Sequence, residues 1–132
     1  MPDGRYLLQL RDDKPGLPLR DHWVVFGGQI EIGEAPEAAL RRELTEELDY
    51  LTRECCWYME SAFILPRAQR RIVRRHYFTV PVVPADIASM VQHEGADMRL
   101  FTLEEILSLP RVSPWDLGVI LMHTRGPDLF AL

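Results

Sequence analysis

The sequence has little cysteine and no long apolar stretch. Its two cysteines, Cys55 and Cys56, are adjacent among 132 residues. Neighbouring residues of a strand point to opposite faces, so a disulfide between them would be strained. Two free thiols indicate a reducing compartment, and we expect a cytoplasmic protein. No segment approaches the roughly 20 apolar residues of a membrane span, and residues 1–5 lack the apolar region of a signal peptide.

Basic residues are not in excess either, because the formal net charge is −5. A protein that binds duplex DNA normally presents a basic face, so this balance argues against that partner. An acidic protein can still bind a phosphate-bearing small molecule when divalent cations lie between the carboxylates and the phosphates. The length suits one domain with one core, which we expect to span residues 1–132.

The hydrophobic pattern predicts strands and helices that do not alternate strictly. Strands are expected at residues 6–10, 23–26, 55–65, 72–83 and 98–101. One helix is expected from residues 35–36 onward, a second after the N-cap Thr102, and a third from Ser113 to about residue 124. This mixture predicts the α/β class, with a mixed sheet and helices on its faces.

Three glutamates share one face of the first expected helix. Glu43, Glu46 and Glu47 are spaced i, i+3, i+4, and like charges at this spacing cost roughly 0.2–0.5 kcal/mol per pair on an isolated helix. Glu47 falls close to Leu40, at the border of the apolar stripe, so the cluster needs a counterion. Arg42 can reach Glu46 at i+4. A hard divalent cation such as Mg²⁺ would neutralise the cluster better, because it prefers oxygen ligands and keeps waters for a substrate phosphate.

Two glycines precede this helix. Gly27 and Gly28 end the strand-like run at residues 23–26 and lead into the loop before the helix. Glycine permits unusual backbone angles and a close approach of the backbone to a ligand. We therefore expect a main-chain carbonyl here to serve as a metal ligand.

Residues 28–50 resemble the Nudix box, G-x5-E-x7-R-E-U-x-E-E-x-G-U, in which U is an aliphatic residue. The residues that match at the required spacing are Gly28, Glu34, Arg42, Glu43, Leu44, Glu46 and Glu47. Two positions differ, because Asp49 replaces a glycine and Tyr50 replaces an aliphatic residue. The glycine position follows the helix and is expected to adopt a left-handed conformation, which aspartate tolerates better than most residues.

The resemblance implies an α/β/α sandwich in which the box forms a loop–helix–loop. It also implies an enzyme that hydrolyses a nucleoside diphosphate linked to another moiety, by attack of water at phosphorus. The options include a nucleotide sugar, ADP-ribose, a dinucleoside polyphosphate or a nucleoside triphosphate. The implied metal ligands, for Mg²⁺ or Mn²⁺, are Gly28, Glu43, Glu46 and Glu47.

The remaining roles follow from the same resemblance. Arg42 would orient the carboxylates, and Arg42 and Arg11 are the expected substrate-binding residues. The general base would be Glu46 or Glu43 within the box, or Glu94 in a later loop. Nudix domains generally have a strand before the one expected at residues 6–10, and this sequence begins almost at that second strand. Either the first strand is absent, or the start lies too far downstream, or a partner subunit supplies an edge. An open sheet edge favours pairing with another chain, so we expect a homodimer.

Other interpretations stay open at this point. One alternative is a non-catalytic Nudix-fold sensor that binds a nucleotide and regulates a partner. Another is a purely structural protein whose glutamates form a solvated helix face. A basic cluster between the two middle strands is either a phosphate clamp or a solvated hairpin loop, and it contains Arg67, Arg70, Arg71, Arg74 and Arg75.

Overall fold

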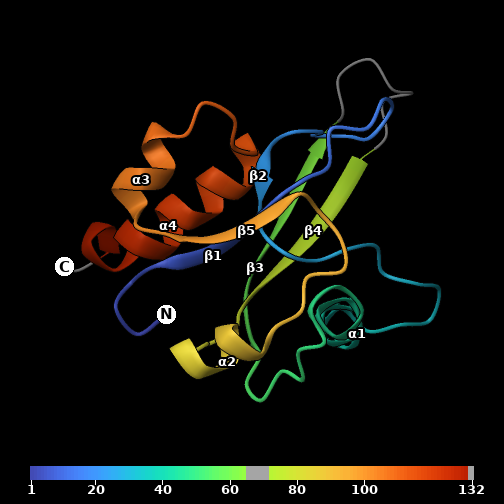
Figure 1. Ribbon diagram of the computed structural model, residues 1–132. Coiled ribbons are helices and arrows are strands. Elements are labelled where there is room, and N and C mark those ends of the chain that lie inside the picture. The colour runs from blue at the N-terminus through green and yellow to red at the C-terminus, as the bar shows by residue number, and fades with distance from the viewer. Residues whose placement is uncertain (65–71, 131–132) are drawn as a thin grey trace.

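The computed structural model describes residues 1–64 and 72–130, which form strands flanked by helices (Figure 1). The link expected at residues 66–71, and with it Arg67, Arg70 and Arg71, lies outside the described residues. No helix in the described ranges is long and apolar enough to cross a membrane. Cys55 and Cys56 are both free thiols, as their adjacency predicted.

Three strands form the sheet that supports the candidate site. Strand β1 (Tyr6–Leu10) lies between β2 (Trp23–Val24) and β5 (Asp97–Phe101), and both pairings are antiparallel. Strand β2 is shorter than predicted, since the apolar run at residues 23–26 keeps ladder pairing only at its first two residues. Residues 25–28 then leave the sheet and lead towards the next helix.

Two further strands form a separate hairpin. Strands β3 (Cys56–Ile64) and β4 (Ile72–Thr79) pair antiparallel. The sequence predicted a mixed sheet, whereas the described strands form two antiparallel sheets, and the parallel component is an isolated bridge between Trp23 and Val112. Strand β4 ends earlier than predicted, shortly before Pro81, which has no backbone N–H for a ladder hydrogen bond.

The helices follow the predicted start signals. Helix α1 (Pro36–Leu48) begins at a proline, as does α2 (Pro84–Ser89), in a segment whose pattern was ambiguous. The capping box predicted for α3 (Leu103–Ser108) is confirmed, because Glu105 N–H donates to Thr102 Oγ1 at 3.2 Å and Thr102 N–H donates to the Glu105 carboxylate at 2.8 Å.

Helix α4 (Pro114–Phe130) is longer than the sequence predicted. Its start is confirmed, since the Oγ of Ser113 accepts a hydrogen bond from the N–H of Asp116 at 3.3 Å. Helix α4 also brings the Asp116 carboxylate against the backbone of Val25, directly after β2, and against Tyr77 of β4.

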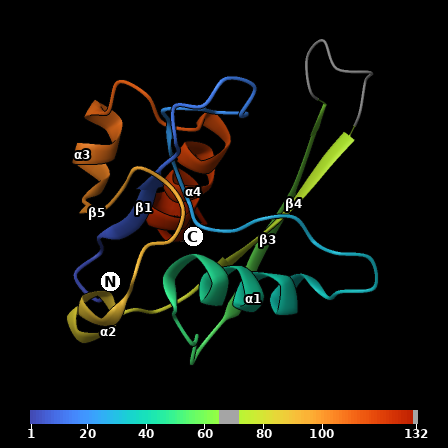
Figure 2. The same ribbon diagram turned by 45° about the vertical axis from the view of Figure 1, so that its right-hand side comes forward.

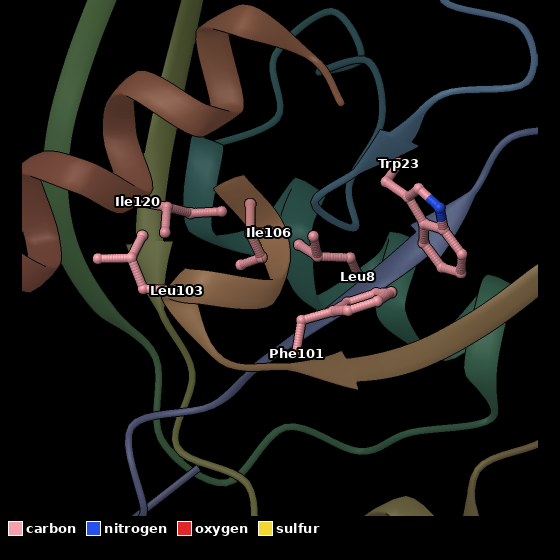
Figure 3. Close-up of a cluster of buried hydrophobic side chains, with 6 residues drawn as sticks. All are labelled: Leu8, Trp23, Phe101, Leu103, Ile106 and Ile120. Carbon is pink, nitrogen blue, oxygen red and sulfur yellow. The ribbon is translucent and has the colours of Figure 1, made fainter. Parts of the chain in front are cut away.

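Two hydrophobic clusters lie on opposite sides of β1 and β5, one beneath α3 and α4 and the other beneath α1 (Figures 1 and 2). The first joins sheet and helix residues (Figure 3) and contains Leu8, Trp23, Phe101, Leu103, Ile106 and Ile120. The second contains Leu44, Leu48, Tyr50 and Val82. This layering confirms the predicted α/β/α arrangement and fixes α1 against the sheet.

Candidate active site

Helix α1 ends in the left-handed turn that the sequence predicted. Asp49 has φ 52° and ψ 28°, and its N–H donates to the carbonyl of Thr45 at 3.0 Å. Tyr50 N–H donates to the carbonyl of Leu44 at 3.3 Å, and its side chain is buried in the cluster beneath α1. The two departures from the box therefore preserve the helix terminus and the packing behind it.

The guanidinium of Arg42 is bonded to several acceptors around the start of α1. Its Nε and Nη2 donate to the two oxygens of Glu34 at 2.9 and 3.0 Å. Its Nη1 donates to Glu43 at 2.8 Å and to Glu46 at 3.2 Å, and its Nη2 also donates to the carbonyl of Gln29 at 3.0 Å. We call these four side chains the Arg42 cluster: Glu34, Arg42, Glu43 and Glu46.

The electrostatics of the Arg42 cluster follow from these contacts. Hydrogen bonds from Arg42 hold the pKa of the Glu34 carboxyl below its ordinary value. Glu34 first, and then Glu43, raise the pKa of Arg42. Because its nitrogens already donate to protein acceptors, the geometry favours the orienting role for Arg42 over direct contact with a substrate.

Gly28 lies directly against the carboxylate of Glu43. A Cβ added at Gly28 would overlap that carboxylate, so any other residue here would force the Glu43 side chain to move. The preceding Gly27 has φ +143°, a region that side chains rarely adopt. The two glycines thus allow the backbone before α1 to pass beside Glu43.

Glu47 differs from the other two glutamates, because it is 6% exposed whereas the Glu46 side chain is 61% exposed. Its Oε2 is buried and has no hydrogen-bond partner among the described residues. Burial, and then the charges of Glu43 and Glu94, raise the pKa of Glu47 to about 7. The border position predicted from the helix pattern is therefore confirmed.

Glu47 lines a cavity of about 410 Å³ between the end of β1 and the loop that precedes β5. Arg11 and Lys14 line it from one side, and His93 and Glu94 from the other. The Nε of Arg11 is also buried without a hydrogen-bond partner in the described part of the chain. A larger groove of about 530 Å³ lies between β5 and α3, and no residue of the box lines it.

The three glutamates of α1 offer the type of ligand atom that a hard divalent cation prefers. Glu43, Glu46 and Glu47 supply carboxylate oxygens, and the Glu47 oxygen has no competing partner within the residues described. Within the same residues, no three His, Cys, Asp or Glu side chains are grouped closely enough to hold a metal ion. The reason is visible in the contacts, since Glu43 and Glu46 are bonded to Arg42 while Glu47 faces the cavity.

A family model described as the NUDIX domain matches residues 1–121. The chain belongs to the Nudix hydrolase family. The nucleoside triphosphatase NudI of Escherichia coli strain K12 is 49% identical over 47 residues. That match covers 35% of this chain and 32% of NudI, so this likeness spans about a third of the relative's length.

Two solved structures share the fold. The MutT protein from Methanosarcina mazei Go1 superposes with a TM-score of 0.77 at 20% identity, covering 94% of this chain and 86% of that one. The NUDIX domain of Shewanella oneidensis NrtR, solved with ADP ribose, gives a TM-score of 0.67 at 20% identity, covering 92% and 77%. At these identities the likeness shows the fold alone.

The predicted site residues of this Nudix protein fall into two neighbouring groups. Glu43, Glu46 and Arg42 belong to the Arg42 cluster, with Gly28 beside Glu43. The other predicted residues line the cavity together, namely Arg11, Glu47 and Glu94. Glu47 joins the two groups, because it is on the same helix as the cluster and its pKa responds to both Glu43 and Glu94.

Sequence reasoning missed two side chains at this site. His93 lines the cavity, and its Nε2 lies 2.8 Å from Oδ2 of Asp49. From the sequence, Asp49 was interpreted as a tolerated replacement of glycine, and no role was predicted for His93. The sequence did offer a signal, namely a histidine next to the candidate base Glu94 and an extra carboxylate in the box. However, a local pattern cannot show that two residues 44 positions apart are paired.

Proposed function

We propose that this Nudix protein hydrolyses the diphosphate of a nucleoside diphosphate linked to another moiety, with Mg²⁺ or Mn²⁺ as its cofactor. Nucleotide sugars, ADP-ribose, dinucleoside polyphosphates and nucleoside triphosphates all contain the bond in question. The likeness to NudI, whose name states a nucleoside triphosphatase, supports a nucleotide substrate.

The observation that carries the proposal is the buried carboxylate of Glu47. Its Oε2 has no hydrogen-bond partner within the described residues, and it lies on a cavity wall beside Arg11 and Glu94. Burial outweighs the hydrogen bond from the Gly27 backbone, so ionising this carboxylate is costly, and a bound cation would remove that cost. In a purely structural glutamate, Oε2 would be expected to have a hydrogen-bond donor as well.

The cation would be held by Glu47 with Glu43, Glu46 and the carbonyl of Gly28. When bound, it supplies positive charge that polarises a phosphoryl oxygen and lowers the pKa of the attacking water. Arg42 keeps Glu43 and Glu46 on the same side of α1. Arg42 bonds one oxygen of each glutamate, Oε1 of Glu43 and Oε2 of Glu46, so the other oxygen of each would face the cation. Glu34 is the further partner that neutralises Arg42.

Among the three candidate bases, the geometry favours Glu94. Glu94 is exposed at the cavity beside Glu47, and within the described residues no ion pair engages it. Glu43 and Glu46 are instead paired with Arg42 at 2.8 and 3.2 Å. Glu94 would accept the proton of the attacking water, while Arg11 contributes a positive charge to the same cavity for the substrate phosphates.

A product-release assay tests this proposal. The purified protein is incubated with each of the four substrate classes, with Mg²⁺ or with EDTA, and products are separated by chromatography. We expect cleavage of at least one class with Mg²⁺ and none with EDTA. Cleavage that persists in EDTA would contradict the metal role, and absence of cleavage in a folded, metal-binding protein would contradict the enzyme.

A second candidate function is a nucleotide-binding regulator. It is favoured by the fold shared with NrtR, a protein whose Nudix domain was solved with ADP ribose. This alternative predicts that ADP-ribose binds in calorimetry but is not consumed when Mg²⁺ is present. Consumption of the bound nucleotide would exclude it in favour of the hydrolase.

A homodimer is also part of the proposal. Within the described residues, β3 and β4 pair only with each other, so this hairpin has outer edges that can accept another strand. Gel filtration at micromolar concentration is expected to give the mass of a dimer. Elution as a clean monomer would contradict this expectation.

A further inference from the structure

The loop before β5 is attached to the end of α1 through its backbone. Val91 N–H donates to the carbonyl of Leu48 at 3.0 Å, and His93 N–H donates to the carbonyl of Glu47 at 2.8 Å. These carbonyls belong to the last turn of α1, where no further turn of helix supplies a donor. The loop thus caps the helix that carries the glutamates.

One side-chain contact adds to this attachment. The Nε2 of His93 lies 2.8 Å from Oδ2 of Asp49, in a pair whose side chains are 47% and 57% exposed. Asp49 occupies the position where the Nudix box has glycine, and it keeps the left-handed φ of 52°. A glycine there would preserve the backbone but would leave His93 without its acceptor. The contact is therefore specific to the departure from the box.

The far side of the same loop is fixed to β1. Ala96 N–H donates to the carbonyl of Leu10 at 2.8 Å. Gly95 has φ +86°, and an added Cβ would lie 2.9 Å from that carbonyl, so the backbone passes as close to β1 as it can. Glu94 is consequently the single residue between a contact to α1 at His93 and a contact to β1 at Gly95.

We propose that the Asp49–His93 contact is a positioning element for Glu94, holding the loop so that the Glu94 carboxylate stays beside Glu47 and Arg11 in the cavity. The inference rests on the proposed hydrolase function, and it assigns a role to Asp49, which replaces the glycine of the Nudix box. A contact between two such exposed side chains contributes little to the free energy of unfolding. The effect of the pair is therefore expected in the rate of catalysis and in the loop, and not in global stability.

Two substitutions at one position separate the contact from the backbone. In Asp49→Gly the left-handed turn is retained and the acceptor is lost. In Asp49→Asn the turn is retained and the amide oxygen can still accept a hydrogen bond from His93 Nε2. We expect Asp49→Gly to lower kcat about 10-fold with KM nearly unchanged, because small displacements of a catalytic group are costly. Asp49→Asn is expected to stay near the wild-type kcat.

A double-mutant cycle shows whether the effect passes through Glu94. In a Glu94→Gln background, the further change Asp49→Gly is expected to cause no additional loss of kcat. Multiplicative losses from the two changes would overturn the proposal, because Asp49 would then act independently of Glu94. Equal kcat values for Asp49→Gly and the wild type would overturn it as well.

Asp21 provides a matched control. It also has a left-handed φ, of 55°, and it also pairs with a basic side chain at 2.8 Å, that of Arg111. Asp21→Gly therefore removes an equivalent exposed contact away from the loop, and kcat is expected to stay at the wild-type value. A loss equal to that of Asp49→Gly would show that any such change slows the enzyme, and would overturn the proposal.

Hydrogen exchange distinguishes failure of this proposal from failure of the proposed function. We expect amide exchange at residues 91–96 to be faster in Asp49→Gly than in the wild type, and unchanged in Asp49→Asn. A wild-type protein that cleaves no substrate would overturn the function, and the positioning role with it. An active wild type whose Asp49→Gly variant shows unchanged exchange and unchanged kcat would overturn the positioning role alone.

Discussion

Arg42 holds the Glu34 carboxylate through two hydrogen bonds, from Nε to Oε2 at 2.9 Å and from Nη2 to Oε1 at 3.0 Å. This two-point contact fixes the plane of the guanidinium and so directs its remaining nitrogen, Nη1, at Glu43 and Glu46. The arrangement depends on the fork-shaped guanidinium, because the single ammonium of lysine cannot bond both oxygens and both glutamates in this geometry.

Replacing Arg42 with lysine is therefore expected to be damaging although the charge is kept. We predict that Arg42→Lys lowers kcat/KM and the affinity for Mg²⁺ by about 10–100-fold, as expected for residues that orient metal ligands. Steady-state kinetics and a Mg²⁺ titration give both quantities. The neighbouring Arg41→Lys is the control, since Arg41 pairs with Glu37 on the exposed side of α1, and its kinetics are expected to stay at wild-type values.

The raised pKa of Glu47 predicts a pH-dependent stability. Burial, and then Glu43 and Glu94, raise this pKa from an ordinary 4.5 to about 7, so the folded protein favours the protonated carboxyl. The contribution of the protonated Glu47 carboxyl to the unfolding free energy is fully present below pH 4.5 and is lost as the pH rises through 7. In EDTA, the unfolding free energy of the wild type is therefore expected to decline between pH 4.5 and 8. We predict that this decline is smaller in Glu47→Gln by on the order of 1–3 kcal/mol.

Urea unfolding at several pH values in EDTA measures this effect. Glu46→Gln is measured alongside as the comparison, because the Glu46 side chain is 61% exposed. Adding Mg²⁺ at pH 8 is expected to stabilise the wild type and to have little effect on Glu47→Gln, because binding of the ion requires the ionised carboxylate. An identical decline in the wild type and Glu47→Gln would contradict the assignment of the titrating group.

The buried Asp116 connects helix α4 to both sheets. Its carboxylate accepts hydrogen bonds from Val25 N–H at 3.2 Å, Tyr77 Oη at 3.0 Å and Arg75 Nη1 at 3.3 Å. Burial raises the pKa of Asp116, and burial together with the charge of Asp116 raises that of Tyr77 to about 12. This contact joins the end of β2 to β4, which share no ladder within the described residues.

Removing this carboxylate leaves buried donors without an acceptor. We predict that Asp116→Ala lowers the unfolding free energy by about 3 kcal/mol, measured by urea denaturation. Glu60→Ala is the comparison, because Glu60 pairs with Arg74 on the surface of the hairpin, and we expect a change within about 0.5 kcal/mol. Equal effects of the two substitutions would show that Asp116 is not a structural connection.

Much of the candidate site was predictable because its signal is local. The spacing of Glu43, Glu46 and Glu47 along one helix determines which side chains share a face, and the burial of Glu47 follows from its place beside Leu40. The left-handed turn at Asp49 was expected from the resemblance, because the Nudix box has glycine at this position after the helix. These features depend on neighbours within seven residues of one another along one helix.

The remaining features depend on contacts between distant segments, and local pattern does not encode them. The pairing of Asp49 with His93 and the convergence of three elements on Asp116 both require knowledge of the tertiary fold. The apolar run at residues 23–26 also overstated β2, because apolar residues leaving a sheet can remain buried by packing. For the same reason, the division of the strands into two sheets was not predictable from strand composition alone.

The most direct test of the central claim is the turnover of Glu47→Gln at saturating Mg²⁺, on the best substrate found in the product-release assay. Circular dichroism establishes that the variant is folded. We predict that kcat falls by about 100-fold or more, because in the proposed site the buried carboxylate beside Arg11 and Glu94 would hold the cation. A wild-type kcat in folded Glu47→Gln would contradict the account, because the buried carboxylate would then have no part in the reaction.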